Sequence, residues 1–331
     1  MTDWTKRSLL AGATAFAAMA LASTAVMAQE FPNKPITMVV PFAAGGPTDI
    51  IARVVAESMS RSMGQQVVVE NVAGAGGTTG ITRASKATPD GYTIMMGHMG
   101  THGAAPGMYP TLGYNPQTDF EPIGLAAGTA ILLVAKKDFA AKDLKEFITF
   151  VKGNQDKVNQ AHAGLGSVSH ITCVMLQAEM GTKINAIPYR GTGPAMNDLV
   201  GGTVDFMCDQ IVSVAQQVKG NTIKAYAIAS PQRNPALPDV PTTAEAGLPN
   251  FQVSAWNAVF APKGTPAAVV AKLSQALATA VTDPAARKRL VDLGADVPDA
   301  AGASPAALAA LVKRENERWI PLLKNAGVVA Q

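Results

Sequence analysis

Short apolar runs alternate along this chain with segments in which apolar residues recur every three or four positions. Ile36–Val40 is almost wholly apolar, which predicts a buried strand, and residues 50–59 have the amphipathic spacing of a helix. Further strands are predicted at 66–70, 92–97, 131–135, 158–162, 184–189, 204–208, 223–229 and 251–262. Further helices are predicted at 144–152, 168–180, 194–200 and over most of 266–326. This alternation is typical of an α/β fold with mostly parallel sheets flanked by helices.

The predicted elements form two series, and the chain crosses between them twice. We therefore expect two lobes, one built from residues 29–127 plus 254–331 and the other from 128–253, with a ligand cleft between them. The crossings lie near Ala127-Gly128 and Val253-Ser254, where small residues favour hinges.

A glycine-rich turn at 41–49 lies between the first predicted strand and the first predicted helix. Gly45 and Gly46 allow a sharp turn, and Thr48 or Asp49 can cap the helix, so that unpaired N–H groups point outward. Such a helix end binds anions, including carboxylates. Similar loops surround Gly166 and Gly193, and all three are expected to converge at the carboxyl ends of the strands. Arg190 beside one of these loops is either a salt-bridge partner for an acid or an ordinary surface arginine.

Residues 1–28 have the features of a cleaved signal peptide. Lys6 and Arg7 precede an alanine-rich apolar stretch, and Val26-Met27-Ala28 offers small residues for cleavage before Gln29. A transmembrane anchor is the alternative, although the small residues are weakly hydrophobic for that role. We expect a soluble periplasmic protein, exported by the general or the twin-arginine route. The formal net charge of +3 gives no electrostatic footprint for nucleic acid or a membrane surface.

The chain contains two cysteines, Cys173 and Cys208. In an oxidising compartment they could form one disulfide. We favour two separate buried thiols, because both lie in apolar segments and a chain of this size buries a sufficient core without a cross-link.

The sequence argues against catalysis and against a metal site. It lacks the nucleophile elbow, the phosphate loop and the zinc-protease motif, and no cofactor is expected. Ser167 and His170 could serve an exported hydrolase as nucleophile and base, but Ser167 is more simply a helix cap. His98 and His102 are four residues apart and could serve a periplasmic copper-binding protein. The glycines between these histidines do not favour a regular helix there, so facing ligands are not assured.

Several motifs occur in a fixed order through nearly the whole chain after residue 28. They are Pro35-Ile36, Pro41-Phe42 through Gly45-Gly46 to Asp49, Asn71 to Gly77, Pro89-Asp90-Gly91-Tyr92-Thr93, Gly164-x-Gly166-Ser167-x-x-His170, Pro188-Tyr189-x-Gly191-x-Gly193-Pro194, Gly202-x-Val204-Asp205, Asp209 and Pro241-Thr242 with Glu245. In these motifs the chain resembles solute receptors of the tripartite tricarboxylate transporter family, which have the two-lobed type II periplasmic binding-protein fold.

The resemblance implies a receptor and not an enzyme. Such a receptor captures an organic acid by lobe closure and delivers it to a membrane permease with a large and a small subunit. We expect a monomer that binds a dicarboxylate, aliphatic or aromatic. Carried over to this chain, the resemblance places the following residues at the ligand: Phe42, Ala43, Gly45, Thr48 and Asp49 in one lobe, and Gly164, Ser167, His170, Thr192, Gly193 and Asp209 in the other.

The segment 97–102 departs from the family pattern. It follows a predicted strand of the first lobe, so we expect it to enter the cleft. His98, Thr101 or His102 would then contact the distal end of the ligand.

Overall fold

The computed structural model describes residues 31–325, and the folded unit begins at Lys34. The predicted signal peptide at 1–28 lies outside the described residues. Within the described range, no helix is both long and apolar enough to cross a membrane.

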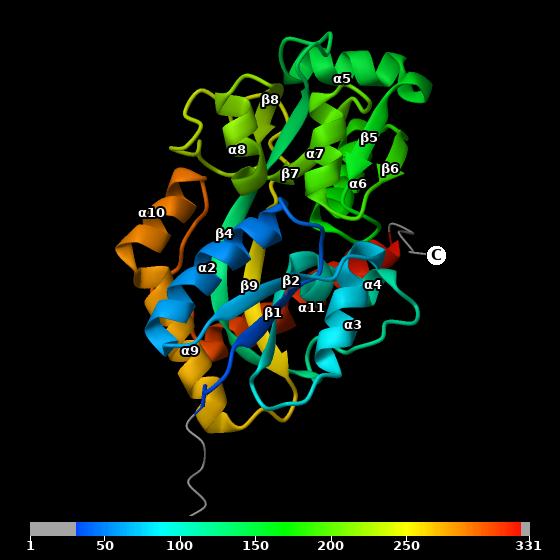
Figure 1. Cartoon of the computed structure of the whole chain (residues 1–331). Coiled ribbons are helices and arrows are strands. Elements are labelled where there is room, and N and C mark those ends of the chain that lie inside the picture. The colour runs from blue at the N-terminus through cyan, green and yellow to red at the C-terminus, as the bar shows by residue number, and fades with distance from the viewer. Residues whose placement is uncertain (1–30, 326–331) are drawn as a thin grey trace, which may run out of the picture. The chain divides into compact units, whose positions relative to one another are not determined.

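The unit contains strands and helices that alternate along most of the chain (Figure 1). The strands are β1 (Ile36–Val40), β2 (Val67–Asn71), β3 (Thr93–His98), β4 (Phe120–Lys136), β5 (Asn159–His162), β6 (Asn185–Pro188), β7 (Phe206–Gln210), β8 (Ile223–Ile228) and β9 (Ser254–Pro262). The α-helices are α2 (Pro47–Met63), α3 (Thr78–Ser85), α4 (Ala105–Met108), α5 (Leu144–Gly153), α6 (Val168–Met180), α7 (Thr192–Val200), α8 (Ile211–Lys219), α9 (Ala267–Thr282), α10 (Pro284–Asp292) and α11 (Pro305–Asn325). A π-helical turn, Met99–Ala104, joins β3 to α4, and short 3₁₀ turns occupy Ala75–Gly77 and Gln155–Lys157.

One strand, β4, is shared by two parts of the sheet. Its residues 120–130 pair with β9, and residues 131–136 pair with β7 and β8. We call the part with β1, β2, β3, β9 and residues 120–130 the first half, and the part with β5–β8 and residues 131–136 the second half. Helices α2–α4 and α9–α11 pack with the first half and α5–α8 with the second, and β4 and β9 run between them (Figure 1).

The sheet combines parallel and antiparallel pairs. Its order is β2-β1-β3-β9-β4-β7-β5-β6, with β8 also paired to β4. The outer strands pair in parallel, as β1 does with β2 and β3, and as β5 does with β6 and β7. The central pairs around β4 and β9 are antiparallel. The predicted α/β class is thus observed, with the antiparallel pairs where the chain crosses. The predicted lobe boundaries and hinges remain predictions.

Local sequence signals explain the two helices that matter most for the site. Helix α2 begins at Pro47, which suits the first helical position, and ends at Gly64 in the left-handed conformation. Helix α6 has the predicted bounds: the hydroxyl of Ser167 accepts a hydrogen bond from the N–H of His170, which confirms the predicted cap, and Gly181 ends the helix.

Two sequence predictions about elements were incomplete. The strand predicted at 131–135 begins eleven residues earlier, at Phe120, because its first part fills the antiparallel crossing beside β9. Helix α8 was not anticipated.

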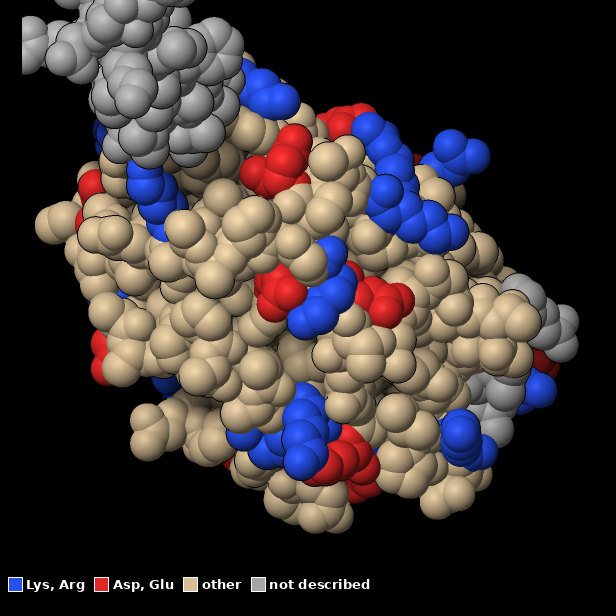
Figure 2. All heavy atoms as spheres, turned by 90° about the horizontal axis from the view of Figure 1, so that it is seen from below, with Lys and Arg blue, Asp and Glu red and all other residues tan. Residues whose placement is uncertain are grey.

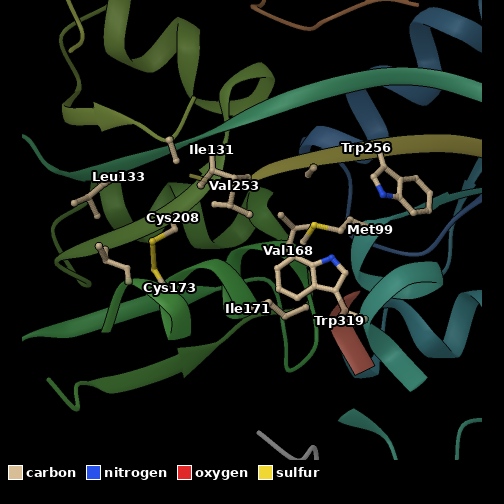
Figure 3. Packing of buried hydrophobic residues seen from close by; sticks show 14 of the residues in the cluster. Met99, Ile131, Leu133, Val168, Ile171, Cys173, Cys208, Val253, Trp256 and Trp319 are labelled. Atoms are coloured by element: carbon tan, nitrogen blue, oxygen red, sulfur yellow. A yellow bond between two sulfur atoms is a disulfide. The ribbon is translucent and has the colours of Figure 1, made fainter. Parts of the chain in front are cut away.

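The cysteine prediction was wrong, because Cys173 and Cys208 form a disulfide. Cys173 on α6 and Cys208 on β7 are fully buried, and their Cα atoms are 5.5 Å apart, within the range that a disulfide spans. The packing of α6 on the sheet brings together two cysteines that are 35 positions apart in sequence. Figure 3 shows the bridge at one end of the buried apolar cluster.

Two tryptophans lie farther along this cluster from the disulfide, Trp319 beside Met99 and Trp256 beyond it (Figure 3). Trp256 belongs to β9 and Trp319 to α11. Both indole N–H groups donate to the same carboxylate oxygen, Oε2 of Glu315, at 3.2 Å and 3.0 Å. The apolar cluster therefore extends through both halves of the molecule.

Candidate functional site

A small cavity lies where the two halves meet. It is lined by Phe42, Gly46, Pro47, Thr48, His98, Ala163, Ser167, Val168, Ser169, Thr192, Asp209 and Gln210. These residues follow or end the strands β1, β3, β5, β6 and β7, so the cavity is at the carboxyl ends of strands, where α/β proteins bind ligands. Among residues 31–325, no lysine or arginine lines it.

Four helices begin at this cavity. Residues of the first turn or cap of α2, α6, α7 and α8 contribute to its wall. Among the described residues, no acceptor takes the backbone N–H groups of Thr48 and Asp49 on α2 or of Val168 and Ser169 on α6. Free N–H groups and the positive ends of helix dipoles favour an anion. The cavity thus offers positive potential without a positively charged side chain.

The β1–α2 loop is held in place by Asp49. Its Oδ2 accepts hydrogen bonds from the N–H of Gly45 and from Nε of Arg53, both at 3.0 Å, while its Oδ1 accepts one from Asn71. Asn71 also donates to the carbonyl of Phe42. Burial opposes ionisation of Asp49, but these hydrogen bonds and the charge of Arg53 outweigh it and hold the pKa of Asp49 below its usual range.

The predicted cap of this helix was therefore placed incorrectly. The capping position is Gly46, and no side chain caps the helix there. Asp49 bonds back to Gly45 instead, and Gly45 has the left-handed φ of +82° that the turn requires. Thr48 remains free to face the cavity.

His98 forms the wall opposite α6. Its ring stacks on Phe42, with centroids 4.9 Å apart. Its Nδ1 accepts the backbone N–H of Thr101 at 3.1 Å, so in the neutral ring the proton is on Nε2. Burial lowers the pKa of His98 to about 4, which keeps the ring neutral at physiological pH. His98 thus presents a neutral N–H donor beside the cavity.

Thr101 and His102 lie behind His98 and do not line the cavity. The Thr101 hydroxyl donates to the His98 carbonyl and contacts Nδ1 of His102 at 2.9 Å. The His102 ring stacks on Phe260 with centroids 4.0 Å apart, and burial lowers its pKa to about 3. The π-helical turn after β3 directs the two histidines to different places. Among the described residues, no group of three or more His, Cys, Asp or Glu is placed to hold a metal.

The α6 wall combines two serines. Ser167 caps the helix, and its Oγ lies 3.2 Å from Oγ of Ser169, which also accepts the N–H of Ala163. His170 does not line the cavity, because its Nδ1 accepts the N–H of Gly166 and its ring packs on His162. Within residues 31–325, no hydrogen bond joins a ring nitrogen of His170 to Ser167, so the nucleophile–base pair of a hydrolase is not assembled.

The β7 wall carries an acid and an amide. Asp209 accepts hydrogen bonds from Ser213 and from the Thr192 side chain. Burial raises its pKa to about 6 in spite of these bonds. Gln210 accepts from Thr129 at 2.7 Å and from Asn257 at 2.9 Å through Oε1, so its amide NH₂ is left to face the cavity.

Other predicted residues hold the two halves together. The N–H of Ala43 donates to the carbonyl of Arg190 at 3.1 Å, and a Cβ at Gly193 would overlap the carbonyl oxygen of Ala44. Gly164 lies against Gly76, and Gly45 against Gly193. Close by, the Tyr109 hydroxyl contacts the carbonyls of Leu165, at 2.6 Å, and Ala75, at 2.8 Å.

The structure thus divides the predicted residues into two groups. Phe42, Thr48, Ser167, Thr192 and Asp209 line the cavity, whereas Ala43, Gly45, Asp49, Thr101, His102, Gly164, His170 and Gly193 support it or join the halves. Sequence reasoning left out of its site the residues Gly46, Pro47, Ala163, Val168, Ser169 and Gln210, whereas His98, one of its three candidates for the distal end of the ligand, lines the cavity. The signal that could have found Ser169 and Gln210 is their position at the start of a helix, next to a predicted residue.

Comparison with known proteins decides the family. A family profile described as "Tripartite tricarboxylate transporter family receptor" matches residues 51–328. The chain belongs to this family. It is therefore of the class of periplasmic solute-binding receptors. The family resemblance inferred from the sequence motifs is confirmed.

Several solved structures are similar to the chain over most of its length. The periplasmic binding protein BugD is 47% identical, with a TM-score of 0.88 over 91% of this chain and 100% of BugD. MatC from Rhodopseudomonas palustris with bound malate is also 47% identical, with a TM-score of 0.86 over 88% and 100% of the two chains. A second R. palustris protein, Rpa4515 with adipate, is 31% identical, with a TM-score of 0.85 over 90% and 99%. These neighbours confirm the two-lobed periplasmic binding-protein fold.

Proposed function

We propose that this receptor captures an organic dicarboxylate in the cavity between its halves and delivers it to a two-subunit membrane permease. The observation that carries the proposal is the convergence of four helix N-termini on one cavity whose wall contains no lysine or arginine. Neutral N–H and hydroxyl donors suit carboxylates, and the neighbours that hold malate and adipate contain ligands of this class.

The proposal includes closure of the two halves around the acid. Supporting it, several contacts between the halves are made by backbone groups and glycines, such as the hydrogen bond from Ala43 to Arg190 and the approach of Gly45 to Gly193. The hinges proposed near Ala127-Gly128 and Val253-Ser254 lie where β4 and β9 pass from one half to the other. We further propose that residues 1–28 are removed on export and that the mature protein is a periplasmic monomer without enzymatic activity.

A thermal-shift screen against mono-, di- and tricarboxylates, including malate and adipate, tests the proposal. A ligand at about 100 times its dissociation constant stabilises the folded state by about 2.7 kcal/mol, which raises the melting temperature measurably. We expect at least one dicarboxylate to stand out. The proposal fails if every acid leaves the melting temperature unchanged.

A pair of matched variants separates binding from general stability. Ser167→Ala removes a helix cap at the cavity. Asp143→Ala removes the cap of α5, in which Oδ1 of Asp143 accepts the N–H of Glu146 at 2.8 Å; Asp143 does not line the cavity. Each loses about 1 kcal/mol of stability. The ligand-induced shift should shrink in Ser167→Ala and persist in Asp143→Ala. Equal shifts in both variants would place the acid elsewhere.

A further inference from the structure

Asp209 is an acid in the wall of a cavity that is built to attract anions. Its side chain is buried, with 1% of the residue exposed. The groups that donate to it are the hydroxyl of Ser213, at 2.8 Å, the Thr192 side chain and the backbone of Gln210, all of them neutral. No ion pair involves Asp209 among the described residues. Two like charges enclosed in one small space repel strongly, because little water is present to screen them.

Among the described residues, the cationic side chains on the elements around Asp209 are all paired with other groups. The titratable or charged residues on these elements are Asp49, Arg53, Glu57 and Arg61 on α2, His98 on β3, Glu121 and Lys136 on β4, His162 on β5, His170 and Glu179 on α6, Asp198 on α7 and Lys219 on α8. Arg61 is paired with Glu57. Burial lowers the pKa of all three histidines, so they are uncharged at neutral pH. Arg53 is paired with Asp49 and Lys136 with Asp205. Lys219 bonds the carbonyl of Asp292, away from the cavity, and the Cys173–Cys208 disulfide does not titrate.

We propose that Asp209 takes up a proton from solvent when the receptor binds a carboxylate, and that its carboxyl O–H then donates a hydrogen bond to the ligand. This inference rests on the proposed function. The proton removes the repulsion between two carboxylates and converts an acceptor in the wall into a donor, as in other enclosed carboxyl pairs. Burial already brings the pKa of Asp209 to about 6, and a ligand carboxylate in the same cavity raises it further.

The affinity of the receptor for its acid should then depend on pH. At a pH above the pKa that Asp209 has in the receptor without ligand, the binding of each ligand requires the uptake of one proton. The dissociation constant therefore rises about tenfold per pH unit. Below that pKa the proton is already present, and the dependence on pH disappears. Ligand binding is thus coupled to the uptake of a proton by Asp209, which has no cationic partner among the described residues.

Isothermal titration of the purified protein with malate, and in parallel with adipate, tests the inference. Titration at about pH 7.5 in two buffers of different ionisation enthalpy gives the number of protons taken up per ligand. We expect close to one, and a dissociation constant that rises between about pH 6.5 and 8.5, where both ligand carboxylates are ionised. Binding with no proton uptake and no dependence on pH would overturn the inference and leave the proposed function intact.

Two variants sharpen the assignment to Asp209. Asp209→Asn places an uncharged amide where the protonated carboxyl would be, so it should still bind, with proton uptake near zero. Asp296→Asn is the matched control: burial also raises the pKa of Asp296, but this residue lies outside the cavity wall and pairs through its backbone with Gly128. It should keep the uptake of the wild type.

The remaining outcomes are also decisive. Equal proton uptake in wild type and Asp209→Asn would assign the proton to another group and overturn the inference. Binding of malate without uptake, together with no binding of adipate, would overturn it too, because Asp209 would then accept from the ligand hydroxyl. If Asp209→Asn fails to fold, the uptake and pH profile of the wild type still decide the question. If no acid binds at all, the proposed function fails and this inference with it.

Discussion

Each half of the molecule has a buried aspartate at or just behind the cavity wall, and the two are in opposite circumstances. On the first half, Asp49 is paired with Arg53 and surrounded by donors, and its pKa is held low. On the second half, Asp209 has only neutral partners, and burial raises its pKa to about 6. The comparison teaches that a buried aspartate near the cavity is a structural anchor or a responsive group according to whether a cationic side chain reaches it.

The walls also differ in what holds them in place. The first wall relies on side-chain hydrogen bonds to a turn, through Asp49 and Asn71. The second wall is tied covalently, since the Cys173–Cys208 bridge joins α6, which is capped by Ser167, to β7, which ends at Asp209 and Gln210. On the face seen from below in Figure 2, charged side chains of both signs are scattered, with neither sign gathered into one field.

Removal of the disulfide has the largest expected effect on stability. The double variant Cys173→Ala/Cys208→Ala frees a loop of 35 residues, which lowers the free energy of unfolding by about 3–4 kcal/mol through the entropy of the unfolded chain. Urea denaturation measures the loss, with reduced wild-type protein as the comparison. An unchanged unfolding midpoint would show that packing alone holds the second wall.

Gly193→Ala has the next largest effect, and it acts on ligand affinity. The added Cβ would overlap the carbonyl oxygen of Ala44, so the halves could no longer approach each other as closely. We expect affinity for the acid to fall by about 100-fold, equivalent to about 2.7 kcal/mol, with little change in stability. Gly153→Ala is the control, since nothing lies near its added Cβ. Retention of full affinity by Gly193→Ala would mean that this contact is not part of the bound state.

The comparison of the two acids is tested by Asp49→Asn and Asp209→Asn. The first weakens the bonds with Arg53 and Gly45 and should destabilise the protein by about 1–2 kcal/mol at neutral pH. Asp209→Asn should instead stabilise the protein at neutral pH, by a similar amount. The folded-state pKa of Asp209 lies above the usual value of 3.8, so wild-type stability falls as pH rises from about 4 to about 6, and the variant lacks this fall. Thermal unfolding from about pH 4 to neutral pH measures both; effects of the same sign at neutral pH would contradict the comparison.

Tyr109→Phe has the smallest expected effect. It removes the hydroxyl that contacts the Leu165 carbonyl of the other half. Loss of this hydrogen bond should cost about 1 kcal/mol of binding free energy, which is roughly a fivefold loss of affinity. Tyr189→Phe is matched to it, because that hydroxyl donates to Asp198 within the second half. Calorimetric titration with the acid found in the screen distinguishes them. Equal losses would show that the Tyr109 contact does not favour the closed arrangement.

Much of the fold could be predicted from the sequence because its signals are local. The apolar run of β1, the cap of α6 and the glycines after the strands each depend on a few neighbouring residues. Phe42 and Ser167 could be placed near a ligand because they follow strands whose carboxyl ends meet.

The remainder depends on geometry that a linear pattern does not contain. Nothing in the sequence distinguishes His98 from His102 as a ligand contact. Because of the π-helical turn between them, His98 lies at the cavity whereas His102 packs on Phe260. The pairing of Cys173 with Cys208 depends on how α6 packs on β7. The family resemblance named residues of the β1–α2 loop but could not separate Thr48, which faces the cavity, from Asp49, which supports it.

Trp256 and Trp319, whose indole N–H groups both donate to the Glu315 carboxylate, give the protein an intrinsic fluorescent reporter. Both indoles are buried in the first half, and Trp256 lies two residues beyond Ser254, at the proposed hinge of β9. The emission of an indole changes when its hydrogen-bond partner or its exposure to water changes. A rearrangement at the crossing would therefore alter the intrinsic fluorescence of the receptor, and ligand capture could be followed in real time without attaching a dye.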